Sequence, residues 1–199
     1  ASAILEASRE KIEQNLFLKN KKVIFTSGAT ESNNLALLGF ARNYHKKTGN
    51  YGHIITLKTE HKAVLEPLYQ LKKEGFMVTE ITPERDGIIS EEQFRKNIRE
   101  DTFMVSVMMA NNEIGVIQPI ENISKICKSR GITFHSDFAQ CLGYIELENL
   151  LSNVNMITMS SHKIYGPKGI GLLLIDQDIT LEPLIVGGGQ EYGFRSGTL

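Results

Sequence analysis

The sequence predicts an α/β protein, a three-layer sandwich in which helices cover both faces of a mostly parallel sheet. Short apolar runs alternate with amphipathic segments along most of the 199 residues, which is the pattern of repeated strand–helix units. The run 102–109 is nearly unbroken in its apolar character, as expected of a central parallel strand buried on both faces. No repeat or linker divides the chain, so a single domain over 1–199 is predicted.

The elements follow from periodicity and turn chemistry. Apolar residues three or four positions apart predict helices at 2–18, from SGATESNN to Tyr44, and at 63–74, 90–100 and 119–130. Strands are predicted at 23–26, 53–59, 77–81, 102–109, 132–136, 156–160 and 169–175. A hydrophilic, helix-like segment precedes 156–160, and a last short apolar run covers 181–186. One strand near the end is expected to run against the others.

Composition excludes several classes of function. The formal net charge is -1, so the overall balance does not indicate binding to nucleic acid or to an anionic membrane. No apolar run reaches the length of a membrane span, and the first residues do not resemble a signal peptide; we expect a cytoplasmic protein. Cys127 and Cys141 have no CxxC or paired histidine spacing, which predicts neither a metal site nor a disulfide framework.

An acid and a lysine are predicted to face each other at one edge of the sheet. Asp137 follows the run 132–136, and Lys163 lies just past the run 156–160. The two residues would lie side by side if these runs are neighbouring strands. A lysine can hold pyridoxal phosphate as a Schiff base, and a carboxylate can keep its pyridine nitrogen protonated. The pair therefore suggests this cofactor, although each residue alone could be an ordinary turn residue.

Other segments have both a plain and a functional interpretation. SGATESNN joins a strand to a helix, and its glycine turn can direct free backbone N–H groups at a phosphate or form a simple connection. His61, after the strand 53–59, could be a polar loop residue. Asn111 and Asn112 could be turn formers. These residues alone do not decide between the interpretations.

Six segments together resemble the cysteine desulfurases, pyridoxal phosphate enzymes with the aspartate aminotransferase-type fold. The segments are TSGATESNN (26–34), TEHKAV (59–64), ANNEIGVIQPI (110–120), HSDFAQ (135–140), SSHKIYGPKGIG (160–171) and GGGQEYGFRSGTL (187–199). They occur in the family's order over almost the whole chain. The resemblance implies the cofactor-binding large domain at 1–199. The family's leading segment, its small domain and its loop with the nucleophilic cysteine have no counterpart in these residues.

The resemblance also implies a role for each site residue. Lys163 would bind the cofactor and move the substrate α-proton, and His61 would stack on the pyridine and take part in proton transfer. Asp137 would pair with the pyridine nitrogen. Asn112 would contact both the ring hydroxyl and the substrate carboxylate. The other cofactor-binding residues would be Ala29, Thr30, Gln140, Ser160, Ser161 and His162, with Ser161 where the family often has glycine.

Two further residues are expected to act near the substrate and across a subunit boundary. Arg195 resembles the arginine that binds the substrate α-carboxylate, a role suited to a guanidinium fork; a surface arginine paired with Glu191 is the alternative. Thr198 resembles a residue that reaches the phosphate held by the partner subunit. A homodimer is therefore expected.

The family takes sulfur from L-cysteine, leaves alanine, and passes a persulfide to acceptor or scaffold proteins for iron–sulfur cluster assembly or thio-modification. The alternatives are a related lyase or aminotransferase, such as a selenocysteine lyase, and a non-catalytic fragment that binds the cofactor. The chain starts inside a predicted helix without methionine, so we expect a truncated chain. Neither Cys127 nor Cys141 stands at the family's nucleophile position. The chain alone is therefore expected not to turn over L-cysteine.

Overall fold

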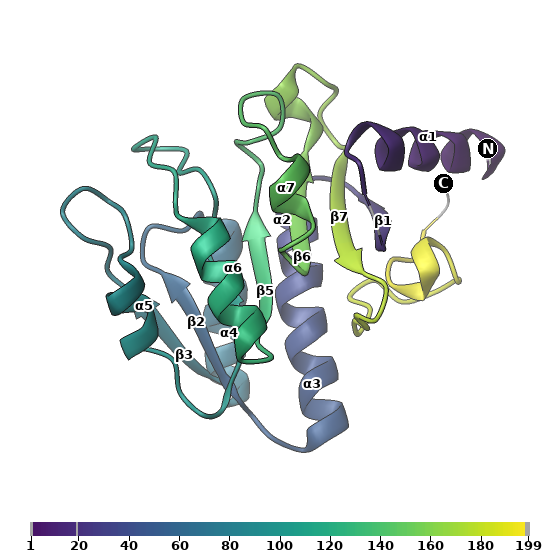
Figure 1. Cartoon of the computed structure of the whole chain (residues 1–199). Helices are drawn as coiled ribbons and strands as arrows, with labels where there is room; N and C mark the ends of the chain where they lie inside the picture. Colours follow the sequence, from purple (N-terminus) through teal and green to yellow (C-terminus); the bar gives the residue numbers. More distant parts are fainter. Residues whose placement is uncertain (1, 19, 198–199) are drawn as a thin grey trace.

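The computed structural model describes residues 2–18 and 20–197, and its centre is a mixed sheet of seven strands (Figure 1). The strand order is β1-β7-β6-β5-β4-β2-β3. The strands are β1 (Lys21–Thr26), β2 (His53–Leu57), β3 (Met77–Ile81), β4 (Thr102–Ser106), β5 (Thr133–Asp137), β6 (Met156–Ser160) and β7 (Gly171–Asp176). Strand β7 runs in the direction opposite to the other six strands. The predicted fold class and the predicted reversal near the end are both confirmed.

Helices cover both faces of the sheet. They are α1 (Ser2–Asn15), α2 (Ala29–Asn34), the π-helical turn Leu35–Gly39, α3 (Phe40–Thr48), α4 (Lys62–Glu74), α5 (Glu91–Lys96), α6 (Ile120–Ser129) and α7 (Glu148–Leu151). In Figure 1, α5, α6 and α7 lie in front of the sheet, and α2, α3 and α4 lie behind it. No helix within 2–18 and 20–197 is long and apolar enough to cross a membrane.

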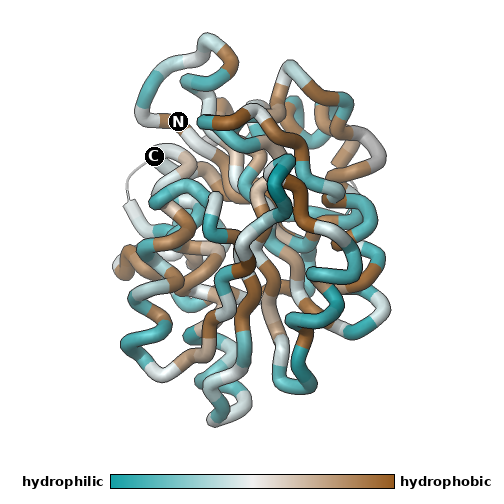
Figure 2. The backbone as a smooth tube through the Cα atoms, turned by 90° about the vertical axis from the view of Figure 1, so that its left-hand side faces the viewer, coloured by the Kyte–Doolittle hydropathy of each residue, from teal (hydrophilic) through white to brown (hydrophobic). Residues whose placement is uncertain are grey.

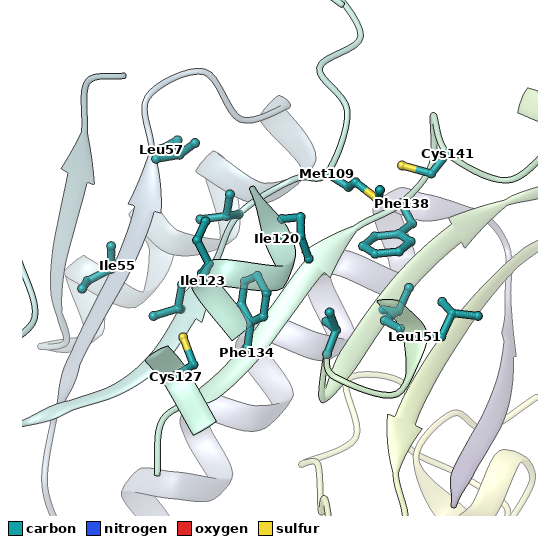
Figure 3. Close-up of a cluster of buried hydrophobic side chains, with 14 of the residues drawn as sticks. Ile55, Leu57, Met109, Ile120, Ile123, Cys127, Phe134, Phe138, Cys141 and Leu151 are labelled. Atoms are coloured by element: carbon teal, nitrogen blue, oxygen red, sulfur yellow. The ribbon is translucent and has the colours of Figure 1, made fainter. Parts of the chain in front are cut away.

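Two hydrophobic clusters fill the spaces between the layers. One packs the front helices on the sheet around Phe134 and Phe138 (Figure 3). The other packs the helices behind the sheet on Ile54 and Met104. The backbone tube in Figure 2 is consistent with these buried clusters, with hydrophobic stretches in the interior and hydrophilic stretches at the periphery. Every residue of β4 is buried, and its centre, Phe103 to Val105, is apolar, as expected of a strand covered on both faces.

Several elements end earlier than the sequence predicts. The first helix ends at Asn15, because Phe17 adopts a left-handed conformation with φ 51°. The helix after Ser90 ends at Lys96. The apolar run 181–186 forms no strand, and only Ile185 makes a bridge, with Arg195. Helix ends depend on local capping and on tertiary contacts, which the apolar period does not report.

The topology brings several loops to one edge of the sheet. Strands β2, β4, β5 and β6 are parallel, so their carboxyl ends point the same way. Strand β1 runs in that direction too, because both β1 and β6 are antiparallel to β7. In open α/β sheets this edge is where ligands bind.

Candidate active site

A cavity of about 470 Å³ lies at the carboxyl ends of these strands. Five loops contribute to it, one after each of β1, β2, β4, β5 and β6. Residues that the sequence analysis singled out line it, namely Ala29, Thr30, His61, Asn112, Asp137, Gln140, His162 and Lys163. The fold therefore gathers into one cavity residues from segments far apart in the sequence.

Asp137 is the last residue of β5 and is only 5% exposed. Its Oδ1 accepts a hydrogen bond from the Ala139 N–H at 2.8 Å, and its Oδ2 accepts one from Asn33 Nδ2 at 2.7 Å. Burial raises the pKa of this carboxyl, and the two hydrogen bonds and the nearby His61 and Lys163 reduce that rise. Both bonded donors are neutral, so the carboxylate has no bonded cation among the described residues.

His61 is the N-cap of α4. Its Nδ1 accepts a hydrogen bond from the Ala63 N–H at 3.0 Å. A ring nitrogen that accepts must carry the lone pair, so the proton of the neutral ring sits on Nε2. The cap fixes the ring at the wall of the cavity and leaves Nε2–H as its remaining donor.

The turn before α2 leaves backbone N–H groups open. Gly28 is the N-cap with φ 153°, and no side chain caps the helix. A Cβ added to Gly171 would lie 2.5 Å from Gly28 Cα, so glycine is required there for the turn to pack on β7. The first N–H groups of a helix have no partner within it. With Ala29 and Thr30 at the cavity wall, this turn is suited to an anion.

The segment after β6 places Lys163 and His162 at the cavity. It forms a 3-10 turn over Ser161–Ile164. The Ser160 hydroxyl and His162 Nδ1 are hydrogen-bonded at 2.8 Å. The Ser161 hydroxyl donates to the Pro167 and Ile170 carbonyl oxygens. Ser160 and Ser161 are not among the cavity-lining residues, and their roles toward a cofactor stay predictions.

Arg195 does not pair with Glu191, the alternative considered from the sequence. Its Nε donates instead to Glu31 Oε1 at 2.8 Å, and Glu31 lines the cavity. Burial alone would raise the pKa of the Glu31 carboxyl, but hydrogen bonds from Arg195 and Ser27 outweigh it and lower the pKa. Arg195 is thus held beside the cavity. Thr198 lies outside the described residues.

The sequence analysis missed several residues of the site. Asn33, Met108, Ala139 and Lys168 were not singled out, although all but Asn33 line the cavity. Asn33 is fully buried and bonds Asp137 from α2. Asparagine is a weak helix former, so its presence inside a predicted helix was the only sequence feature that pointed to a special role for Asn33, and it was a weak one. Its partner could be identified only in the folded chain.

Both cysteines are buried in the front hydrophobic cluster (Figure 3). Burial raises the pKa of the Cys127 and Cys141 thiols to about 12. Neither lines the cavity. A buried thiol with a raised pKa is a poor nucleophile, so both are core residues in this structure.

Comparison with known proteins identifies the family. The model of the family "Aminotransferase class-V" matches residues 1–198. The chain belongs to this family. It is 50% identical to the cysteine desulfurase IscS of Ehrlichia chaffeensis over 202 residues, which is 100% of this chain and 48% of that protein. It is also 50% identical to the mitochondrial cysteine desulfurase of Eremothecium gossypii, over 98% of this chain and 40% of that protein.

Solved structures give the same result. A NifS-like protein superposes with a TM-score of 0.90 at 41% identity, covering 98% of this chain and 53% of the other. SspA in complex with cysteine gives 0.86 at 42% identity, covering 96% and 55%. The chain thus spans about half the length of the relatives that it matches. The predicted family and the mostly parallel fold are confirmed.

Proposed function

We propose that this chain is the pyridoxal phosphate-binding part of a cysteine desulfurase, an enzyme that takes sulfur from L-cysteine and leaves alanine. The observation that carries the proposal is the buried Asp137 carboxylate, which shares a cavity with Lys163 and has no bonded cation. A buried carboxylate of this kind is stabilised by a cationic partner. A protonated pyridine nitrogen supplies one.

The donor set of the cavity fits the cofactor at each end. The open turn at Gly28, Ala29 and Thr30, together with His162, is suited to the phosphate. Lys163 supplies the amine that would hold the cofactor covalently. Asn112 and Gln140 offer amides for the ring hydroxyl. A volume of about 470 Å³ lies within the usual range of small-molecule sites.

When bound, the cofactor supplies an electron sink for the substrate α-carbon. The protein's own groups handle the proton. The Lys163 amine, once released from the cofactor, would take the α-proton of the substrate. His61 lines the same cavity with a proton on Nε2, so in this tautomer it would donate a hydrogen bond.

The substrate carboxylate would be bound by Arg195. In the present structure the Arg195 Nε bonds Glu31, so a substrate carboxylate that bonds Nε as well would replace the Glu31 carboxylate. A bidentate bond to the guanidinium would favour the exchange. L-cysteine as the substrate is supported by the names of the relatives and by the related SspA, which was solved in complex with cysteine.

Transfer of sulfur requires a thiolate that attacks the substrate sulfur and then delivers the persulfide outside the site. Cys127 and Cys141 are buried in the core, and neither has the freedom of a mobile loop. We therefore propose that the attacking cysteine is outside these 199 residues. A homodimer completed by Thr198, sulfur-acceptor or scaffold proteins for iron–sulfur assembly, and a cytoplasmic location belong to the same proposal.

The first test is the position of the cofactor. Protein incubated with pyridoxal phosphate and reduced with borohydride should carry the adduct on Lys163, identified by peptide mapping. Lys163→Ala should abolish the adduct. Lys168→Ala, which removes the other lysine of the cavity, should keep it. An adduct on Lys168, or no uptake by folded protein, would exclude the proposed site.

The second test is sulfide release from L-cysteine in the presence of a reductant. The 199-residue chain alone should release none, and the full-length polypeptide that carries these residues should release sulfide. Turnover by the short chain that Cys141→Ala abolishes would make Cys141 the nucleophile. Sedimentation at micromolar concentration tests the dimer, and a monomer that binds the cofactor independently of Thr198 would contradict the role of that residue.

A further inference from the structure

A second buried carboxyl lies under the cavity and has no role in the mechanism described so far. Glu60 is 6% exposed and stands next to His61, between β2 and α4. Its Oε1 accepts a hydrogen bond from the Met108 N–H at 2.8 Å. Its Oε2 is buried and bonds no other atom of the described residues. Glu60 therefore calls for a physical explanation, because buried polar atoms usually have partners.

The contacts of Glu60 join two walls of the cavity. The Met108 N–H bond ties the segment after β2 to the segment after β4. A second bond runs the same way, from Asn111 Nδ2 to the Thr59 carbonyl oxygen at 2.7 Å. His61 follows Glu60 directly, and Asn112 follows Asn111. The two bonds thus set the distance between His61 and Asn112 across the cavity.

The surroundings of Glu60 disfavour its charged form. An ionised carboxylate would have one N–H donor and one oxygen without any partner, in a place closed to water. None of the ion pairs found in residues 2–18 and 20–197 includes Glu60. Burial raises the pKa of Glu60 well above its usual range, and the nearby Asp137 carboxylate raises it further against the opposing Met108 N–H bond.

We propose that Glu60 is a positioning residue of this site, a neutral carboxylic acid that clamps the His61 segment to the Met108–Asn112 segment and leaves Asp137 as the charged member of these two neighbouring buried acids. The inference rests on the proposed function. A second negative charge there would add repulsion without a partner. A neutral acid keeps the acceptor that the Met108 N–H needs and adds no charge.

Two substitutions separate the acceptor from the charge. Glu60→Gln keeps an acceptor oxygen and is neutral at every pH. Glu60→Leu is of similar size and removes the acceptor, so the buried Met108 N–H loses its partner. Glu66→Gln is the matched control, because Glu66 is an exposed glutamate on α4. All variants are made in the full-length polypeptide that carries these residues.

The first readout is binding of pyridoxal phosphate, followed by the absorption band of the bound cofactor. Glu60→Gln and Glu66→Gln should bind within about twofold of the wild type, with the same band. Glu60→Leu should bind about tenfold more weakly, with a shifted band, because His61 and Asn112 are no longer held at their distance. Normal cofactor affinity in Glu60→Gln together with reduced affinity in Glu60→Leu would show that the hydrogen-bond acceptor at position 60 is the required group.

The second readout needs no cofactor. Infrared spectra of the cofactor-free protein should contain the carbonyl stretch of a protonated carboxylic acid at neutral pH, and Glu60→Gln should remove it. An absent band, or a Glu60→Gln variant that binds as weakly as Glu60→Leu, would overturn the neutral acid. Normal cofactor binding and an unshifted band in Glu60→Leu would overturn the clamp.

These outcomes are distinct from failure of the proposed function. If the wild type takes up no pyridoxal phosphate, the proposed function is wrong. The infrared band of the cofactor-free protein then still decides the protonation state of Glu60. Thermal unfolding of the cofactor-free protein then tests whether Glu60 holds the two segments together. Glu60→Leu should lower the unfolding temperature, and an unchanged temperature would overturn the proposed role of the contact with Met108.

Discussion

Asp137 and Glu191 are two buried carboxylates in opposite situations. They are 5% and 4% exposed. Asp137 accepts bonds from two neutral donors, Asn33 Nδ2 and the Ala139 N–H. Glu191 bonds the Arg9 guanidinium at 3.1 Å and the Phe25 N–H at 2.8 Å. The two carboxylates are therefore equally buried, and they differ in the charge of the groups that bond them.

Arg9 completes the structural case. Its guanidinium also donates to the Val23 carbonyl oxygen and lies over the Phe25 and Tyr192 rings, at 5.1 and 5.0 Å from their centroids. The Arg9–Glu191 pair ties α1 and β1 to the segment that carries Arg195. Its two opposite charges neutralise each other within the protein. The Asp137 carboxylate has no bonded cation among the described residues, and we propose that a ligand supplies one. The following predictions test this contrast, beginning with the largest expected effect.

Breaking the completed pair should cost the most stability. Glu191→Ala leaves the buried Arg9 cation with only the exposed Glu6 as an acid partner, so the free energy of unfolding should fall by about 3–5 kcal/mol. Urea unfolding of the cofactor-free protein measures it. Glu74→Ala removes the acid of the partly exposed Arg42–Glu74 pair and should cost about 1 kcal/mol or less. Similar losses in both variants would show that the Arg9–Glu191 pair is not special.

Removing the unpaired charge should impair binding instead of folding. Asp137→Asn keeps an acceptor for the Ala139 N–H, and Asn33 can rotate its amide to offer Oδ1, which has no partner now. Cofactor affinity should fall roughly 30-fold, about 2 kcal/mol, because the ring nitrogen loses its counter-ion. Titration followed by absorbance measures it. Unchanged affinity together with lowered stability would make Asp137 a structural acid.

The same substitution sharpens the contrast through pH. Burial raises the folded-state pKa of Asp137 above its unfolded value. Its stabilising contribution is therefore complete below the unfolded pKa, about 4, and is lost as pH rises through the folded pKa. Between pH 4 and 8 the cofactor-free wild type should lose stability relative to Asp137→Asn. Because the Asp137 carboxylate also raises the pKa of Glu60, both proteins are compared in a Glu60→Gln background. Parallel stability curves would contradict the raised pKa of Asp137.

The smallest effect is expected at Cys141, in the core beside the site. Cys141→Ala removes one buried sulfur and should cost about 1 kcal/mol of stability, with cofactor affinity unchanged. In the wild type, an alkylating reagent at neutral pH should modify Cys141 only on the timescale of unfolding, because its thiol is buried. Rapid alkylation of the folded protein would place the thiol in reach of a substrate.

Much of the site could be predicted because parallel strands place their carboxyl ends together. Asp137 and Lys163 follow two such strands, β5 and β6, which are neighbours in the sheet. The same reasoning, joined to the motif resemblance, identified His61 and Asn112. Arg195 was identified by resemblance alone, and its partner Glu31 was not foreseen.

The sequence by itself determined the alternation of strands and helices, the buried central strand and the identity of the loops that carry chemistry, because periodicity and turn residues are local properties. Only the tertiary structure decided which polar groups meet. Asn33 bonds Asp137 across 104 positions, Arg9 bonds Glu191 across 182, and Glu60 bonds Met108 across 48. Such contacts depend on how helices and loops dock on the sheet, where burial makes each polar partner count and local sequence carries no record of it.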